Sequence, residues 1–375
     1  MRTIFELLIS LLCLLYHNGT VQLNNPHVEH EVLILNWFYN QQLSNGLLTS
    51  TESGNLISLY DNSLAALVFM LNEDYARAEK IFDFFDDRIL SELKNGTGGF
   101  SQFRNIDGEP SYHRWVGDNA WLLLALNNYK YITGTYKYDY LILELSNWLI
   151  YLQDHDGGIF AGYDEAGNLM RNKVTEGILD VFSAISGYGS FHQNILRFLS
   201  QNCWDKLDNN MITNQSWSNY NYALDLHSWS YLLFEDYDPS SLTKAERYVT
   251  TQISSVNGES IIGYCFDIDR DVVWLEGTSH MALAFNNADA VDKSQKLLAG
   301  IERNLIMSQI HPNSGGFPYV SNTGTAFGTE KLWDGAEDKI SISTNAWYLF
   351  AKWNFNPFGI SRNKNIPVSD KFWIK

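Results

Sequence analysis

The sequence predicts an all-α protein, an (α/α)6 barrel in which six helical hairpins form an inner and an outer ring. Three observations lead to this prediction. Nearly apolar helical segments alternate with amphipathic ones. The apolar segments begin about every 50 to 70 residues, a spacing that suits helical hairpins. Turns rich in Asn, Asp and Gly connect each amphipathic segment to the apolar segment that follows.

The inner ring is predicted from six segments that are apolar over almost their whole circumference, as buried helices are. The stretch 121–126, Trp-Leu-Leu-Leu-Ala-Leu, is typical of them. Each segment starts beside a polar or acidic residue. The six segments start near Tyr60, Gly117, Thr175, Ala223, Glu276 and Ser343.

The outer ring is predicted from six amphipathic segments that carry Lys, Arg and Glu on one face, as in Ala76-Arg77-Ala78-Glu79-Lys80. A helix with one polar face lies at a surface. The six segments span about 29–42, 74–93, 138–153, 191–203, 242–254 and 292–309.

The links from outer to inner segments share a turn composition, because Asn, Asp and Gly accept the positive φ of tight turns. The apolar residue that follows can begin a short extended stretch. The turns lie at 45–48, 98–100, 156–160, 209–212, 257–258 and 315–317. Six such hairpins close naturally into a ring, with an open solenoid as the alternative. We expect one barrel domain over 27–360 and a C-terminal tail over 361–375.

Composition restricts the class of protein. The 375 residues include 26 Lys and Arg against 43 Asp and Glu, a net charge of −17. That charge repels DNA and RNA, so nucleic acid is not expected as a partner. Aromatic residues make up 14% of the chain, which excludes a disordered protein.

The N-terminal segment 1–20 predicts a secretory signal peptide, because its apolar run is too short to span a membrane and ends in Asn18-Gly19-Thr20. An ordinary N-terminal helix is the alternative. After signal removal we expect a secreted, extracellular monomer that is not bound to a membrane. Asn95 and Asn214 begin glycosylation sequons. Cys203 and Cys265 can form one disulfide or remain two buried thiols.

The hairpins, their DGG-type turns and the acidic residues at the inner-segment starts resemble the six-hairpin glycosidase superfamily. That resemblance covers nearly the whole chain, and no single family is identified. It implies a sugar-active enzyme: a glycoside hydrolase, a sugar epimerase or a polysaccharide lyase. The stretch 153–158, Gln-Asp-His-Asp-Gly-Gly, also resembles repeats of terpene cyclases and prenyltransferases. A clear DDxxD or DxDD motif, which those enzymes use, is absent from the sequence.

Acidic residues recur at five of the inner-segment starts, which a closed barrel brings to one mouth. They are Asp61, Asp118, Glu176, Asp225 and Glu276. Any one of them can simply cap its helix. Five together repel one another and raise one another's pKa. Glycoside hydrolysis needs such an arrangement, with one carboxyl protonated and another ionised.

Glu276 is the expected general acid, because it lies between Trp274, which would desolvate it, and Gly277, which leaves room for a ligand. Asp118 is the expected base, with Asp61 as its substitute. Glu276 and Asp118 begin segments that are not neighbours in the ring. We therefore expect their carboxyl groups to face each other across the mouth, with space for a water molecule and an inverting mechanism.

Further residues near the same starts are expected to bind the carbohydrate. Aromatic rings stack on sugars, His and Arg bind hydroxyl or carboxylate groups, and the remaining carboxyls accept hydrogen bonds. These candidates are Tyr60, His113, Arg114, Trp115, Glu176, Asp225, His227, Trp274, His280 and Trp333.

Two further classes of function stay open. A non-catalytic carbohydrate-binding protein would keep the aromatic residues without a competent acid pair. An epimerase would use a His pair, for which His227 and His280 are candidates. We expect no cofactor and no metal. The alternating carboxylates of 267–271 resemble a calcium loop but lack its Gly and distal Glu.

Overall fold

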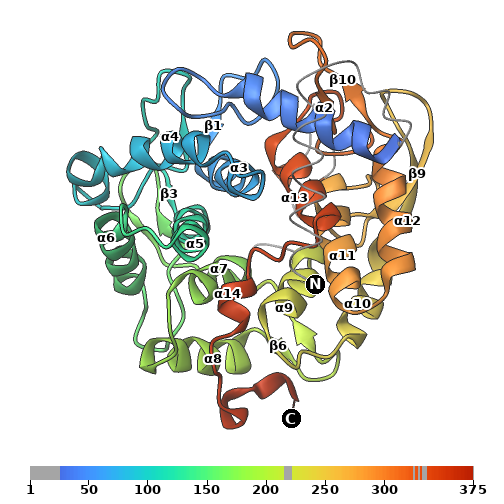
Figure 1. Ribbon diagram of the computed structural model, residues 1–375. Coiled ribbons are helices and arrows are strands. Elements are labelled where there is room, and N and C mark those ends of the chain that lie inside the picture. The colour runs from blue at the N-terminus through green and yellow to red at the C-terminus, as the bar shows by residue number, and fades with distance from the viewer. Residues whose placement is uncertain (1–25, 215–221, 324–325, 328–329, 332–335, 375) are drawn as a thin grey trace, which may run out of the picture.

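The computed structural model describes residues 26–214, 222–323, 326–327, 330–331 and 336–374. The predicted signal peptide lies outside these residues. Within them, all six predicted inner helices are present and form a closed ring (Figure 1). They are α3 (Leu59–Leu71), α5 (Val116–Thr133), α7 (Thr175–Ala184), α9 (Leu224–Leu233), α11 (Leu275–Asn287) and α13 (Ile342–Lys352). Each packs against its two neighbours, and α13 closes the ring against α3. The (α/α)6 prediction is confirmed.

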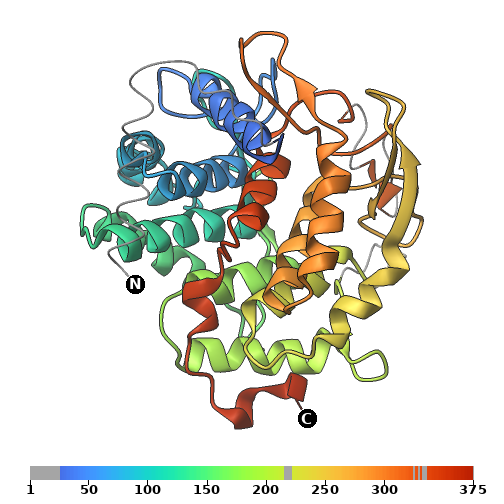
Figure 2. The same ribbon diagram turned by 45° about the vertical axis from the view of Figure 1, so that its right-hand side comes forward.

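The outer ring surrounds the inner one, as Figure 2 shows from a second direction. It consists of α2 (Pro26–Gln41), α4 (Tyr75–Asp86), α6 (Asp139–Tyr151), α8 (Ser190–Asn202), α10 (Ser240–Lys244) and α12 (Val291–Glu302). A π-helical turn, Ile89–Leu93, follows α4. Outer helices such as α8 bury one face, through Ile195, Leu196 and Leu199, and expose the other.

The fifth outer helix differs from the prediction over 242–254. Only α10 and a 3₁₀ turn, Ala245–Tyr248, are helical there, and the chain continues as strand β8 (Val249–Ile253). Strand β8 pairs in an antiparallel register with β9 (Ser260–Tyr264). The β-branched residues Val249, Thr250 and Thr251 favour a strand. Gly258, at φ 73°, allows the tight turn that follows.

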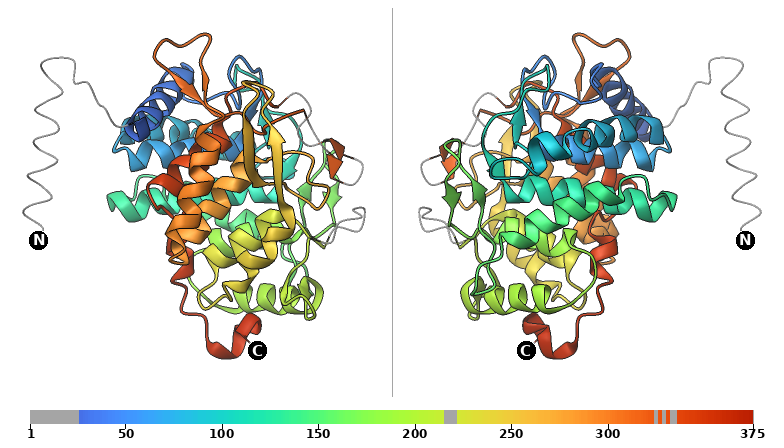
Figure 3. Two further views of the ribbon diagram at one scale, coloured as in Figure 1. Left: turned by 90° about the vertical axis from the view of Figure 1, so that its right-hand side faces the viewer. Right: turned by 90° about the vertical axis from the view of Figure 1, so that its left-hand side faces the viewer.

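Short antiparallel strands gather at one end of the barrel, beside the starts of the inner helices (Figure 3). They are β1 (Ile57–Ser58) with β2 (Phe103–Arg104), β3 (Arg114–Trp115) with β4 (Gly162–Tyr163) and β5 (Leu169–Met170), β6 (Trp204–Asp205) with β7 (Asn210–Met211), β10 (Ile306–Met307) with β11 (Gly315–Gly316), and β12 (Ala326–Phe327) with β13 (Glu330–Lys331). Strands β1 and β3 lead directly into α3 and α5 and so fix where these helices begin.

A buried asparagine in the first turn of three inner helices holds the preceding link. In α5, Asn119 Oδ1 accepts a hydrogen bond from the Phe100 N–H (2.8 Å), and its Nδ2 donates to the Phe100 carbonyl (2.9 Å). Asn62 makes the same pair of bonds to Leu48, and Asn345 to Phe317. These side chains satisfy backbone groups of the turns and tie each turn to its inner helix.

The C-terminal residues pack along the far end of the ring. Helix α14 (Gly359–Arg362) is followed by 3₁₀ turns at Val368–Asp370 and Phe372–Ile374. Trp373 packs against Phe234 in a tilted arrangement, with ring centroids 4.4 Å apart, and its indole N–H donates to the Glu235 carbonyl. Cys203 and Cys265 are both buried free thiols. Among the described residues, no helix combines the length and apolar character that a membrane span requires.

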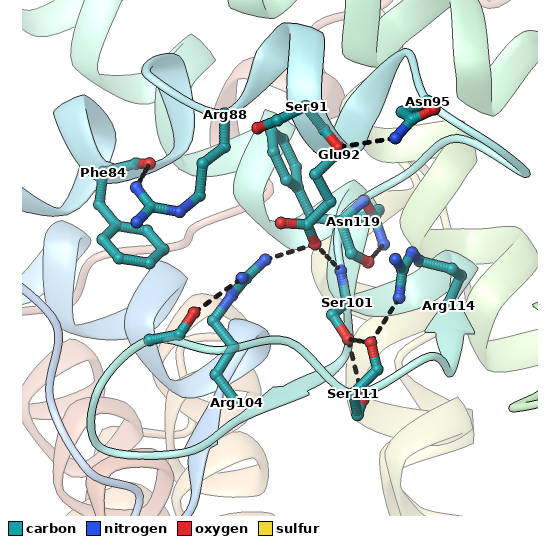
Figure 4. Close-up of polar contacts among 12 residues, drawn as sticks. Phe84, Arg88, Ser91, Glu92, Asn95, Ser101, Arg104, Ser111, Arg114 and Asn119 are labelled. Carbon is teal, nitrogen blue, oxygen red and sulfur yellow. Dashed lines mark hydrogen bonds and ion pairs between the residues drawn. The ribbon is translucent and has the colours of Figure 1, made fainter.

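A buried ion pair joins α4's π-helical extension to the loop before α5 (Figure 4). The Arg104 guanidinium contacts Glu92 Oε1, and both side chains are at most 7% exposed. Glu92 Oε1 also accepts a hydrogen bond from the Ser101 N–H at 2.6 Å. Arg104 additionally donates to the Gly108 carbonyl. Glu92 therefore anchors the chain that leads to the second inner helix.

We expect Glu92→Gln to lower the free energy of unfolding by about 3–5 kcal/mol, because it leaves the Arg104 charge buried without a counterion. Urea denaturation of the variant and the parent protein measures this loss. Exchanging a partly exposed pair, as in Glu79→Gln beside Lys137, is the matched control and should cost less than about 1 kcal/mol. Equal losses in both variants would contradict a structural role of the buried pair.

Candidate active site

A cavity of about 240 Å³ opens where the inner helices begin. Its walls contain both residues of the predicted catalytic pair and six of the predicted binding residues. They are Tyr60, Trp115, Asp118, Glu176, Asp225, Trp274, Glu276 and His280, joined by Gln102, Gly117, Trp121, Asp180, Trp229 and Phe266. A larger cavity of about 340 Å³ beside Asn128 and Lys364 has no carboxyl group in its wall.

Two tryptophans of the cavity wall, Trp121 and Trp229, pack against Trp347, which does not itself line the cavity. The rings of Trp121, Trp229 and Trp347 lie 5.6–6.2 Å apart between centroids. Phe358, just before α14, packs beneath all three. Trp121 and Trp229 follow Asp118 and Asp225 by about one helical turn, so each ring lies on the same helix face as the carboxyl group before it. Trp121 and Trp229 therefore give the cavity an aromatic wall.

Asp180 is an acidic residue of the cavity that the sequence analysis missed. It lies four residues after Glu176 on α7, one turn deeper in the barrel. A Cβ atom at Gly117 would lie 2.8 Å from Asp180 Oδ2, so this glycine permits the close approach of α5 and α7. Burial raises the pKa of Asp180 well above its usual range, and the charges of Glu176 and Asp118 raise it further. The i, i+4 spacing from Glu176 was the available signal.

The carboxyl groups of the mouth influence one another. Burial raises the pKa of Asp118 to about 7, against hydrogen bonds from the Tyr60 backbone and the Gln102 side chain. Burial, together with the charges of Asp225 and Asp118, raises the pKa of Glu176 to about 8. Burial raises the pKa of Asp225 to about 7, with Glu276 adding to the effect. These carboxyl groups line one cavity, which is why their charges act on one another.

Glu276 has a different environment, in which both oxygens accept hydrogen bonds. The Tyr60 hydroxyl donates to Oε1 at 2.8 Å, and the Ser343 hydroxyl donates to Oε2 at 2.7 Å. The Trp347 indole N–H donates to the Tyr60 oxygen at 2.8 Å and orients that hydroxyl. Burial raises the pKa of Tyr60 well above its usual range, so the hydroxyl remains a donor. Donors on both oxygens suit a carboxylate in its ionised form.

Gly277 does not leave the room for a ligand beside Glu276 that the sequence predicted, because the Trp274 ring lies there. A Cβ atom at Gly277 would lie 2.1 Å from Cε3 of Trp274. The space beside this glycine therefore holds the Trp274 ring, not a ligand. The ring packs edge-on against His280, with centroids 5.3 Å apart. His280 Nε2 in turn lies 3.6 Å from Glu276 Oε1, and burial lowers the pKa of His280.

His113 lies one layer behind Asp118. Its Nδ1 is 2.5 Å from Gln102 Oε1, the geometry of a hydrogen bond donated to the amide oxygen. Gln102 lines the cavity, and its side chain hydrogen-bonds to Asp118. The His113 ring stacks on Trp115 at 6.0 Å and 26°. His113 thus orients residues of the wall and is not itself part of it.

Three other predicted residues, all of them described, do not line the cavity. Arg114 donates to the Ser111 carbonyl at 2.9 Å and points toward the Glu92 cluster, which consists of Glu92, Ser101 and Arg104 (Figure 4). His227 is fully buried, and its Nδ1 donates to the Ser241 carbonyl. Asp61 lies beside the wall, and burial raises its pKa to about 8. Trp333 lies outside the described residues.

Comparisons with known proteins support the fold. No family model and no curated protein matches the sequence. A solved glycosidase superposes with a TM-score of 0.60 at 11% identity, covering 90% of this chain and 100% of the other. D-mannose isomerase gives 0.60 at 10%, covering 90% and 99%. Cellobiose 2-epimerase from Bacillus thermoamylovorans B4167 gives 0.60 at 11%, covering 88% and 98%. The resemblance to the six-hairpin glycosidases is thus confirmed at the level of the fold.

The buried carboxyl groups predict a pH dependence of stability. Asp61, Asp118, Glu176 and Asp225 have raised pKa values of about 7 to 8, so the folded protein holds protons that the unfolded chain releases near pH 4. Stability is therefore lost as the pH rises through 7 and 8. The buried His192 and His227, whose pKa falls to about 4, are neutral in both states above about pH 6.5.

We expect the free energy of unfolding to fall by about 2 kcal/mol or more between pH 6.5 and 8.5, which lowers the melting temperature by about 3 °C. Differential scanning calorimetry at several pH values measures this fall. Glu176→Gln removes one of the groups and should flatten the profile. A melting temperature that stays constant or rises over this interval would rule out protonated carboxyl groups at the mouth.

Proposed function

We propose that this protein is a secreted glycoside hydrolase that cleaves an oligo- or polysaccharide by an inverting acid/base mechanism. One observation carries the proposal: two carboxyl groups of one cavity have opposite environments. Asp118 is buried with a raised pKa, and its Oδ2 accepts no hydrogen bond from the described residues. Glu276 accepts a hydroxyl donor at each oxygen. Carboxyl groups whose environments differ in this way divide the acid and base roles between them.

The environments favour exchanging the roles expected from the sequence. Asp118, protonated near neutral pH, is the proposed general acid that donates to the leaving oxygen. Glu276, held by Tyr60 and Ser343, is the proposed base that takes a proton from the attacking water. The helices α5 and α11 are not neighbours in the ring, which suits a water between the two groups and an inverted product. Trp115 at the rim is the proposed stacking surface for a sugar ring.

Incubation with plant, fungal and bacterial glycans, followed by measurement of released reducing ends, tests this proposal. The double variant Asp118→Asn/Glu276→Gln measures the background. Release by the parent protein that is absent from the double variant would support hydrolysis at this site. Glycan binding without product would support a non-catalytic carbohydrate-binding protein. Equal release by both proteins would assign the activity to a different site or to a contaminant.

A second candidate function is sugar epimerisation or isomerisation. His280 is fully buried at the cavity, close to Glu276, and neither ring nitrogen has a hydrogen-bond partner among the described residues. Two of the structural neighbours are named as an isomerase and an epimerase. Incubation of mannose and cellobiose in D₂O separates the candidates. Deuterium uptake at the carbon next to the carbonyl supports proton abstraction from the sugar, which hydrolysis does not involve.

A further inference from the structure

The loop between β9 and α11 brings one thiol and two carboxyl groups together. Cys265, Asp267 and Asp269 each place one ligand atom so that all three atoms lie within 4.8 Å of one another. The Cys265 sulfur is 3.5 Å from Asp269 Oδ1 and 4.0 Å from Asp267 Oδ1. None of the three residues lines the cavity described above. The cluster is therefore separate from the proposed catalytic groups.

The position of Asp267 points independently to a ligand. Its side chain is fully buried. Oδ1 accepts a hydrogen bond from the Asp269 N–H at 3.2 Å. Oδ2 is buried without any hydrogen-bond partner among the described residues. A buried carboxylate oxygen without a donor or a cation is costly, and metal coordination is one of the few arrangements that stabilises it.

We propose that Cys265, Asp267 and Asp269 bind a zinc ion. Zinc takes thiolate sulfur at about 2.3 Å and carboxylate oxygen at about 2.0–2.2 Å. In a tetrahedral site these bond lengths separate sulfur from oxygen by ~3.6 Å, close to the two separations observed. Three protein ligands leave one position for water. On binding, the Cys265 thiol releases its proton to solvent and the sulfur bonds the metal.

The thiol ligand favours zinc over calcium at this site. The sequence 267–271 has alternating carboxylates but lacks the Gly and distal Glu of a calcium loop. Calcium takes oxygen ligands, whereas a thiolate beside carboxylates selects zinc. Cys265 lies two residues before the alternating stretch. The structure brings its sulfur next to the carboxylates of Asp267 and Asp269. Two of the three ligands, Cys265 and Asp267, are buried, so the ion would lie in a partly buried site.

Such an ion would brace one wall of the cavity. Between the two buried ligands lies Phe266, which lines the cavity and whose carbonyl accepts a hydrogen bond from Leu224 N–H at the start of α9. The Phe266 ring packs edge-on against Trp274, with centroids 5.2 Å apart. The zinc site thus acts as a structural link between α9 and the segment that enters α11.

The test uses the full chain, purified without chelator, with Cys203→Ser as the matched control because Cys203 is the other buried free thiol. Metal content is measured by mass spectrometry after dialysis against zinc. Cobalt(II) is then exchanged into the protein and the thiolate-to-cobalt charge-transfer absorption is recorded. We expect about one zinc per chain, the absorption band in the parent and in Cys203→Ser, and neither in Cys265→Ser.

Stability provides a second measurement if a variant folds poorly. Zinc should raise the melting temperature of the parent protein, and a strong chelator should lower it again. Asp267→Asn should abolish that response. Zinc below a tenth of an equivalent with no cobalt band would overturn the proposal. Calcium binding that persists in Cys265→Ser would overturn the zinc assignment and identify the carboxylates alone as a calcium site.

Discussion

Asp118→Asn is expected to lower kcat/KM by at least ~10²-fold on a glycan with an unactivated leaving group. Asparagine keeps the size of the side chain but has no proton to give to the leaving oxygen. In the parent protein that proton is present near neutral pH because burial raises the pKa of Asp118 to about 7. Steady-state hydrolysis by the variant and the parent protein, at one pH and one substrate, measures the loss.

An aryl glycoside with an acidic phenol provides the control, because such a leaving group departs without protonation. The variant should lose much less activity on this substrate if Asp118 is the acid. The parent protein should also lose kcat/KM on the unactivated glycan as the pH rises through about 7, because Asp118 then releases its proton before the substrate binds. Equal losses on both substrates would exclude Asp118 as the acid.

Much of the fold could be predicted because its signals are local and repeated. An apolar run such as 121–126 is kept from water only by burial, and each of the six runs forms an inner helix. The helix predicted over 242–254 was wrong because the charged and apolar residues there fit a helix as well as a hairpin. The β-branched residues and the pairing of β8 with β9 decided the outcome. The pairing partner, β9, lies just beyond the segment that the helical pattern covered, so that pattern alone did not include it.

The candidate site could be predicted in part for the same reason. The first turn of each inner helix reaches the mouth, so Asp118, Glu176, Asp225 and Glu276 were found from their position alone. His227 was misplaced because it follows Asp225 by two residues, which turns it to the opposite side of α9.

Arg114 was misplaced for a related reason, since neighbouring residues of a strand point to opposite faces. Trp115 faces the cavity, and Arg114 faces the Glu92 cluster. The hydroxyl donors on Glu276 are Tyr60 of α3, which lies 216 residues before it, and Ser343 of α13, which lies 67 residues after it. Local sequence carries no information on such partners, so the acid and base roles required the structure.

Glu276→Gln is expected to lower kcat by at least ~10²-fold on activated and unactivated substrates alike, because the base acts on water and not on the leaving group. The amide keeps the size of the side chain and can still accept a hydrogen bond from Tyr60 or Ser343, so the melting temperature should change little. Reaction of the parent protein followed by NMR identifies the anomer formed first. Inversion is expected, since Glu276 and Asp118 begin helices that are not neighbours. A first product of retained configuration would contradict an activated water and indicate a covalent intermediate. Near-normal activity of Glu276→Gln would exclude this residue from the mechanism.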